Sequence, residues 1–128
     1  MLDVGVKGSS TVIVDEGNTA LAIGSGTLRV FATPAMIALV ESTASRSVAP
    51  FLDEGSSTVG THLDVAHTSA TPVGMEVVCE TELIEVDRRR LVFSVVVRDA
   101  AGEIGSGTHE RFIVDNAKFM SKAESKLE

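Results

Sequence analysis

The sequence has 128 residues, of which 44% are hydrophobic, and a formal net charge of −7. This length suits one domain with a single core, and we expect residues 1–128 to form it, with 1–9 and 119–128 peripheral or frayed. The acidic balance and the lack of Trp and Tyr argue against nucleic-acid binding. No apolar run approaches the roughly 20 residues that span a bilayer, so no membrane partner is expected.

The first predicted elements are two short strands, at 10–14 and 18–23, on either side of a turn. A helix is predicted over 34–49, because Thr33 is a good N-cap and Pro34 suits the first helical position. Pro50 disfavours continuation, and Gly55 can adopt the left-handed conformation that ends such a segment.

The hydrophobic pattern then alternates, which predicts an antiparallel meander. Tight hairpins should join its last three strands. The predicted strands are 57–67, 74–86, 90–99 and 103–114. The polar tail after them is expected to be frayed or a short helix.

A single long helix that is apolar over most of its surface must be covered by the sheet. The predicted architecture is therefore the α+β hotdog fold, in which a curved antiparallel sheet wraps one central helix. Such a sheet leaves free edges, which proteins of this fold usually cover by dimerising, so we expect a homodimer.

Three local features have simple structural interpretations. Cys79 is the only cysteine, so no internal disulfide can form, and the simplest location for the chain is the cytoplasm. The alternating segment around it predicts that Cys79 is a small core residue. Arg88–Arg90 is expected to be a solvated turn. The sequence IGSGT occurs twice, and we expect residues 23–27 to be a hinge or lid and 104–108 to contain a strand bulge.

Glu41 is the residue of the helix that most needs an explanation. Its neighbours three, four and seven positions away are small or apolar: Pro34, Ile37, Ala38, Ala44, Ser45 and Val48. An ionised carboxylate buried there must be paired, hydrogen-bonded or protonated. The structural alternative is that Glu41 pairs with a buried Arg or caps the backbone of a strand, whereas the functional hypothesis is a general base.

Thr33 lies at the helix N-terminus, where free backbone N–H groups favour an oxyanion. It is eight residues from Glu41, or about 12 Å along the axis, so the two side chains cannot touch on one straight helix. A substrate, a water or a second subunit must bridge them. As a nucleophile, Thr33 lacks an evident adjacent base.

The three histidines do not have the spacing of a metal site. His62 and His67 are five residues apart on a predicted strand and therefore face opposite sides, as do His109 and Glu110. We expect no metal and no cofactor. His67 either bonds a backbone carbonyl or pairs with Glu41 or the reacting group, where its near-neutral pKa is useful.

Several blocks, in the same order, resemble hotdog-fold acyl-CoA thioesterases of the fluoroacetyl-CoA thioesterase family. The resembling segments are 30–41 (VFATPAMIALVE), 57–75 (STVGTHLDVAHTSATPVGM) and 103–114 (EIGSGTHERFIV). The resemblance implies hydrolysis of a small acyl-CoA to a carboxylic acid and free CoA. It also implies catalytic roles for Thr33, Glu41 and His67, and substrate contacts at Gly60 and Arg111.

The chain departs from this family before the helix. The fluoroacetate-specific branch has an aromatic-bearing lid there, whereas residues 17–29 (GNTALAIGSGTLR) contain no aromatic residue. This difference argues against specificity for the fluoroacetyl group and leaves the thioesterase residues intact. Two alternatives stay open: a non-catalytic acyl-CoA-binding module, and an enoyl-thioester hydratase that uses Asp64 and His67.

Overall fold

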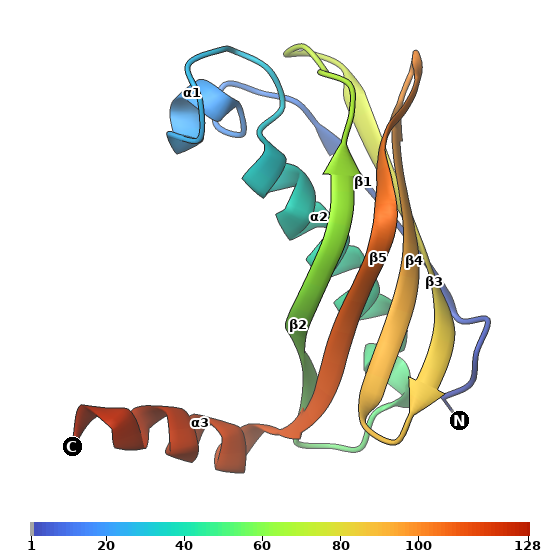
Figure 1. Ribbon diagram of the computed structural model, residues 1–128, viewed down its shortest axis with the longest axis vertical. Helices are drawn as coiled ribbons and strands as arrows, with labels where there is room; N and C mark the ends of the chain where they lie inside the picture. Colours follow the sequence, from blue (N-terminus) through green and yellow to red (C-terminus); the bar gives the residue numbers. More distant parts are fainter. Residues whose placement is uncertain (1) are drawn as a thin grey trace.

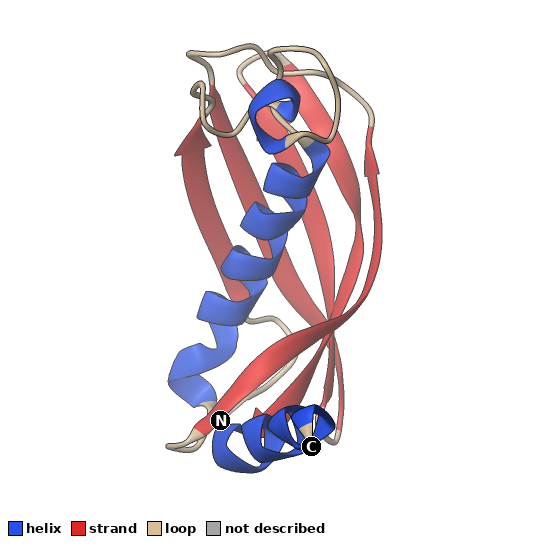
Figure 2. Ribbon diagram, turned by 90° about the vertical axis from the view of Figure 1, so that its left-hand side faces the viewer, coloured by secondary structure: helices blue, strands red, loops and turns tan. Residues whose placement is uncertain are grey.

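The computed structural model describes residues 2–128, which form a five-stranded antiparallel sheet with one long helix across a single face. Figures 1 and 2 show this helix, α2, lying diagonally over the curved sheet. The strand order is β1-β3-β4-β5-β2, so β1 and β2 are the two edges. The strands are β1 Lys7–Ile13, β2 Ser56–His67, β3 Glu76–Asp87, β4 Arg90–Asp99 and β5 Gly102–Asp115. The helices are α1 Ala20–Ile23, α2 Thr33–Val48 and α3 Asn116–Glu124, with 3₁₀ turns η1 Ala49–Phe51 and η2 Ser125–Leu127.

Helix α2 is held to the sheet by one apolar stripe. Its buried residues recur every three or four positions: Met36, Val40, Thr43, Ala44 and Val48. Each large apolar side chain buried in this way contributes about 1.5–3 kcal/mol. The opposite face, which includes Pro34, Ala38 and Arg46, is exposed. The helix is therefore covered on one side only, whereas the sequence predicted a more fully enclosed helix.

The predicted meander is confirmed, because β2 to β5 begin and end within two residues of the predicted strands. The β3–β4 hairpin turns through Arg88, whose φ of 58° is the only positive value at a non-glycine residue within 2–128. The pairing of β4 with β5 skips Ile104, which is the predicted bulge in the second IGSGT segment. Another irregularity separates Gly60 from His62 in β2.

The prediction of a strand at 18–23 is wrong, because this segment contains the short helix α1. The Thr19 hydroxyl caps it by accepting a hydrogen bond from the Ala22 amide at 3.2 Å, and Gly24 ends it with φ 88°. A short apolar run such as NTALAI fits either element, and here the cap and the glycine favour the helix. Figure 1 shows α1 and the following loop at the end of the sheet where α2 begins.

The C-terminal tail forms α3, one of the two alternatives expected from its sequence. The Asp115 side chain caps it by accepting from the Lys118 amide at 3.0 Å. The helix extends away from the sheet, and Phe119 and Met120 on it are exposed. None of the helices within residues 2–128 is both long and apolar enough to cross a membrane.

Candidate active site

Thr33 and His67 meet where α2 begins and β2 ends. The Thr33 Oγ1 lies 2.7 Å from the His67 Nδ1, across the space between the helix and the sheet edge. The expectation that Thr33 is an N-cap is wrong: Ala32 holds that position, without a side-chain cap, and Thr33 is the first helical residue. Its hydroxyl is therefore free to bond the imidazole. The base that sequence alone did not place beside Thr33 is present in the fold.

A pocket of about 350 Å³ opens beside this pair, beneath the α1 loop. Its lining comes from three segments: Ala20 and Ser25; Val30, Phe31 and Thr33; and His67 to Ala70. The second ring nitrogen of His67, Nε2, is buried and has no hydrogen-bond partner among residues 2–128. An unsatisfied buried polar atom costs about 1–3 kcal/mol, so its presence at a pocket wall marks a group suited to a ligand.

The start of α2 adds hydrogen-bond donors to the same pocket. The amides of the first helical turn have no intrahelical acceptor, and Pro34 contributes none. The Thr33 amide is therefore a free donor at this pocket, at the positive end of the helix dipole. A developing negative oxygen next to Thr33 would be stabilised there.

Glu41 lies elsewhere, in a second cluster near the middle of α2. The Glu41 Oε2 accepts a hydrogen bond from the Arg111 Nη1 at 3.2 Å, and the Glu41 side chain is 40% exposed. The expectation of an enclosed, apolar environment is therefore wrong. The alternative that Glu41 pairs with a buried arginine is confirmed, because Arg111 is 6% exposed.

The Arg111 guanidinium is held on three sides by protein groups. The Nε donates to the Thr58 hydroxyl at 2.8 Å and the Nη2 to the Thr58 carbonyl at 2.9 Å. Burial lowers the pKa of Arg111, and the Glu41 carboxylate acts in the opposite direction. An Arg surrounded by acceptors in this way orients its neighbours and has little capacity left for a ligand.

Gly60 and His109 complete this cluster. A Cβ atom at Gly60 would lie 2.4 Å from the Glu41 Oε2, so the absent side chain makes room for the carboxylate. His109 is fully buried, and its Nε2 lies 3.1 Å from the Arg111 Nη1. Sequence analysis did not identify Thr58 or His109 as site residues. The available signal was the spacing of His109 and Arg111, which are two apart and so share one face of β5.

The five predicted site residues therefore form two groups in one protomer. Thr33 contacts His67, whereas Glu41 lies with Gly60 and Arg111. Glu41 is about 12 Å along the helix axis from Thr33. Gly60 and His67 are seven residues apart on the same strand, or about 23 Å. A single small substrate cannot contact both groups within one chain.

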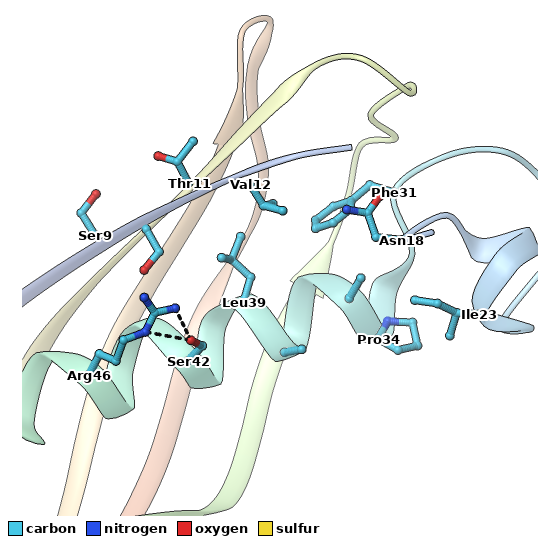
Figure 3. Close-up of a pocket in the computed structure, with 13 residues that line it drawn as sticks. Ser9, Thr11, Val12, Asn18, Ile23, Phe31, Pro34, Leu39, Ser42 and Arg46 are labelled. Atoms are coloured by element: carbon cyan, nitrogen blue, oxygen red, sulfur yellow. Dashed lines mark hydrogen bonds between the residues drawn. The ribbon is translucent and has the colours of Figure 1, made fainter. Parts of the chain in front are cut away.

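A larger groove of about 620 Å³ lies on the other side of α2, between this helix and β1 (Figure 3). Apolar side chains such as Val12 and Leu39 line it, and the Arg46 guanidinium donates to the Ser42 hydroxyl at one end. The groove contains none of the five predicted residues. Phe31 separates it from the smaller pocket and lines both.

Other candidate groups are not arranged for chemistry. Cys79 is fully buried, and burial raises the pKa of its thiol, which suits the core role predicted for it. Asp64 and His67 lie three residues apart on a regular part of β2 and face opposite sides, which removes the acid–base pair of the hydratase alternative. Within residues 2–128, no three His, Cys, Asp or Glu side chains cluster closely enough to hold a metal ion.

Solved structures identify the class of protein. A hot-dog-like protein from Thermanaerovibrio acidaminovorans superposes with a TM-score of 0.90 at 20% identity, covering 99% of this chain and 94% of its own. At that identity the likeness shows the fold alone, and it confirms the predicted α+β hotdog architecture.

Closer relatives identify the family. A sequence model described as fluoroacetyl-CoA-specific thioesterase matches residues 14–117. The fluoroacetyl-CoA thioesterase of Streptantibioticus cattleyicolor is 44% identical over 97 residues, which are 76% of this chain and 70% of that protein. A solved fluoroacetyl-CoA thioesterase superposes with a TM-score of 0.94 at 36% identity, covering 98% of each chain, and a mutant of such an enzyme was solved in complex with acetyl-CoA. The chain belongs to the fluoroacetyl-CoA-specific thioesterase family, and the enzyme class predicted from sequence is confirmed.

Proposed function

We propose that this protein hydrolyses a small acyl-CoA thioester to the carboxylic acid and free CoA. The observation that carries the proposal is the 2.7 Å contact between Thr33 and His67 at the wall of a pocket, together with the second ring nitrogen of His67, which has no partner within residues 2–128. The pocket volume of about 350 Å³ suits a short acyl group and the end of the pantetheine arm. Family membership supplies the thioester as the substrate class.

In the proposed reaction His67 moves the protons. Its Nδ1 holds Thr33, its Nε2 gives a proton to the departing CoA sulfur, and the proton released by the attacking water then restores the ring. The Thr33 oxygen, held in place by that hydrogen bond, can accept a hydrogen from the attacking water and so orient it. The free amides at the start of α2 stabilise the oxyanion, an effect worth about 3–4 kcal/mol per donor in comparable sites.

Glu41 is the proposed base or nucleophile. One route has the carboxylate take a proton from water as that water attacks the carbonyl carbon. The other has the carboxylate attack directly, which releases CoA and forms an anhydride that water then hydrolyses. Both routes require the carboxylate anion, which is the form that pairs with the Arg111 guanidinium. The Gly60 amide, beside Glu41, is a proposed donor to the thioester carbonyl.

The separation of the two groups supports a homodimer as the working unit. The free edge strand β2 is exposed along its middle, and Leu63 on it is 40% exposed. Antiparallel pairing of two β2 edges about a two-fold axis near Leu63 or Asp64 would bring the Gly60 end of one protomer close to the His67 end of the other. One composite site would then contain all the proposed residues. Light scattering should give twice the chain mass, and Leu63→Lys should lower it.

Cytoplasmic location and broad acyl selectivity are further parts of the proposal. A single buried cysteine suits a reducing compartment. The segment from Gly17 to Arg29 contains no aromatic side chain, and its exposed large apolar residues, Leu21, Ile23 and Leu28, are aliphatic. We therefore expect acetyl-CoA and fluoroacetyl-CoA to be hydrolysed with similar kcat/KM.

The test is steady-state release of free thiol from a panel of short acyl-CoA thioesters. We expect hydrolysis of at least one of them, and loss of turnover in Glu41→Gln with acyl-CoA binding retained. Binding without turnover in the folded wild-type protein would instead favour the non-catalytic acyl-CoA module. Arg46→Met, an exposed change on the same helix as Glu41, serves as a control for folding.

A further inference from the structure

His109 is a buried titratable side chain to which the proposed reaction assigns no role. It lies on β5, is fully buried, and packs against Phe93 of β4 with ring centroids 6.4 Å apart. Burying the two ring nitrogens of an imidazole costs free energy unless both form hydrogen bonds. The hydrogen-bond partners of His109 therefore need an explanation.

Those contacts specify one protonation state. The His109 Nδ1 lies 2.8 Å from the His62 carbonyl oxygen, which can only accept, so Nδ1 carries the hydrogen. The His109 Nε2 lies 3.1 Å from the Arg111 Nη1, which can only donate, so Nε2 presents its lone pair. The ring is therefore neutral and in the Nδ1–H form. Burial lowers the pKa of His109, in agreement with this geometry.

The same Arg111 nitrogen also donates to Glu41. The Nη1 carries two hydrogens, and its two acceptors are the His109 Nε2 at 3.1 Å and the Glu41 Oε2 at 3.2 Å. Thr58 fixes the rest of the guanidinium from β2. The direction in which Nη1 presents its second hydrogen is thus set by the imidazole on one side.

We propose that His109 is a positioning residue for Glu41, acting through Arg111: a neutral imidazole that accepts one Nη1 hydrogen and thereby aims the other at the carboxylate. The chain of contacts runs from the His62 carbonyl on β2 to His109, to Arg111 and then to Glu41 on α2. These contacts link the sheet to helix α2 at the Glu41 carboxylate. This inference rests on the proposed role of Glu41 in hydrolysis.

The charged groups around His109 are consistent with a neutral ring. Arg111 on β5 disfavours a second positive charge, whereas Glu41 on α2 and Glu110 on β5 favour one. Glu110 points to the other side of the strand and pairs with Arg90 on β4. On the remaining sides His109 meets Phe93 and Gly60, which carry no charge.

Two amide substitutions at His109 test the hydrogen bonds of Nδ1 and Nε2 one at a time. In His109→Gln the longer side chain places its carbonyl oxygen near the position of Nε2, so Arg111 keeps an acceptor. In His109→Asn the shorter side chain keeps a donor for the His62 carbonyl and leaves Arg111 without an acceptor. Each variant loses one buried hydrogen bond and keeps the same amide group, so their costs in stability should differ mainly by the one methylene that Gln has in addition.

The experiment measures kcat and KM for acetyl-CoA hydrolysis in both variants. We expect His109→Asn to lower kcat about tenfold or more with KM little changed, because a misdirected reacting group slows the chemical step. His109→Gln should stay within about threefold of wild type. Val48→Ala removes buried apolar volume from α2, the helix that carries Glu41, and so controls for an effect of lost stability alone.

The outcomes distinguish this inference from the proposed function. If Glu41→Gln abolishes hydrolysis while the Asn and Gln variants of His109 have equal kcat, the proposed function stands and the positioning role of His109 is wrong. If Glu41→Gln retains wild-type kcat, the assigned role of Glu41 fails first. Nitrogen chemical shifts of wild-type His109 add a test that needs no variant: an Nε2–H form or an imidazolium near neutral pH would overturn the proposal.

Discussion

The two groups of predicted site residues differ in how completely they are satisfied. At the start of α2, Thr33 is exposed, His67 is half-buried, and one ring nitrogen has no partner among residues 2–128. In the middle of α2, every contact of Arg111 is to a protein acceptor, and His109 and Arg111 are buried. The first region leaves the His67 Nε2 without a partner, whereas the second fixes the position of the Glu41 carboxylate.

This difference predicts different responses to mutation. Removing a partner from a satisfied, buried network leaves polar groups that water cannot reach, so stability falls. Removing a side chain from an open pair removes chemistry at little cost in stability. The following experiments test that contrast, beginning with the largest expected effect.

His67→Gln should lower kcat about 10²–10⁴-fold, because an amide cannot carry a proton from one ring nitrogen to a leaving group. The free energy of unfolding should change little, since the replaced contact to Thr33 is in an exposed setting. Thiol release and urea unfolding measure the two effects. A loss of kcat below tenfold would show that His67 is not the proton carrier.

Arg111→Met should lower the free energy of unfolding by about 2–4 kcal/mol. It strands the Thr58 carbonyl, the His109 Nε2 and the Glu41 carboxylate, and the half-exposure of Glu41 keeps the cost from being larger. Arg46→Met is the matched control, because Arg46 is exposed and bonds only the Ser42 hydroxyl in its own helix. Equal costs for the two variants would contradict the contrast between the regions.

Gly60→Ala should displace Glu41 and lower activity more than stability. The new Cβ would lie 2.4 Å from the Glu41 Oε2, and the end of a flexible side chain can move aside. We expect about 1 kcal/mol of lost stability and a larger loss of transition-state stabilisation. In a Glu41→Ala background the stability cost should shrink, since the clash is gone. If Gly60→Ala costs as much stability in the Glu41→Ala background as in wild type, the cost comes from strand β2 and not from the clash with Glu41.

The stability of wild type relative to His109→Gln should fall on acidification. Burial lowers the folded-state pKa of His109 from its ordinary 6.5, so below that pH the unfolded chain binds a proton that the folded chain does not. The contribution is complete above 6.5 and declines below it until the folded-state pKa is reached, by at most about 1.4 kcal/mol per pH unit. Urea titrations across this range measure the difference, and a flat difference would mean that His109 titrates normally.

Thr33→Ala should change the free energy of unfolding by about 0.5 kcal/mol or less. Thr33 caps nothing, and the better helix propensity of alanine offsets the lost hydrogen bond to His67. A cost of about 1 kcal/mol or more, as for a true N-cap, would show that the hydroxyl also supports the helix. Thr19→Ala, which removes the observed cap of α1, provides the comparison.

Local patterns predicted the regular elements well and the residues at their ends poorly. The alternating runs after Gly55 gave β2 to β5, because side-chain periodicity is a property of the strand alone. The helix was placed within one residue of its start, yet Thr33 was assigned to the wrong position. Whether a threonine caps a helix or bonds another side chain depends on what lies beside it, and His67 is 34 residues away in the chain.

For the candidate site, too, local sequence features predicted some properties and contacts between distant residues determined the others. The sequence by itself determined that one acidic residue lies on the central helix, that it is too far from Thr33 to touch it, and that an α+β hotdog thioesterase is the protein class. Helical rise and residue spacing are enough for the first two conclusions, whereas the thioesterase class came from the resemblance of three sequence segments to a known family. Only the tertiary structure decided that Glu41 meets Arg111 and that His109 lies behind them, because those contacts join residues about 70 positions apart. No local pattern encodes the distance between β5 and α2, which the packing of the helix on the sheet determines.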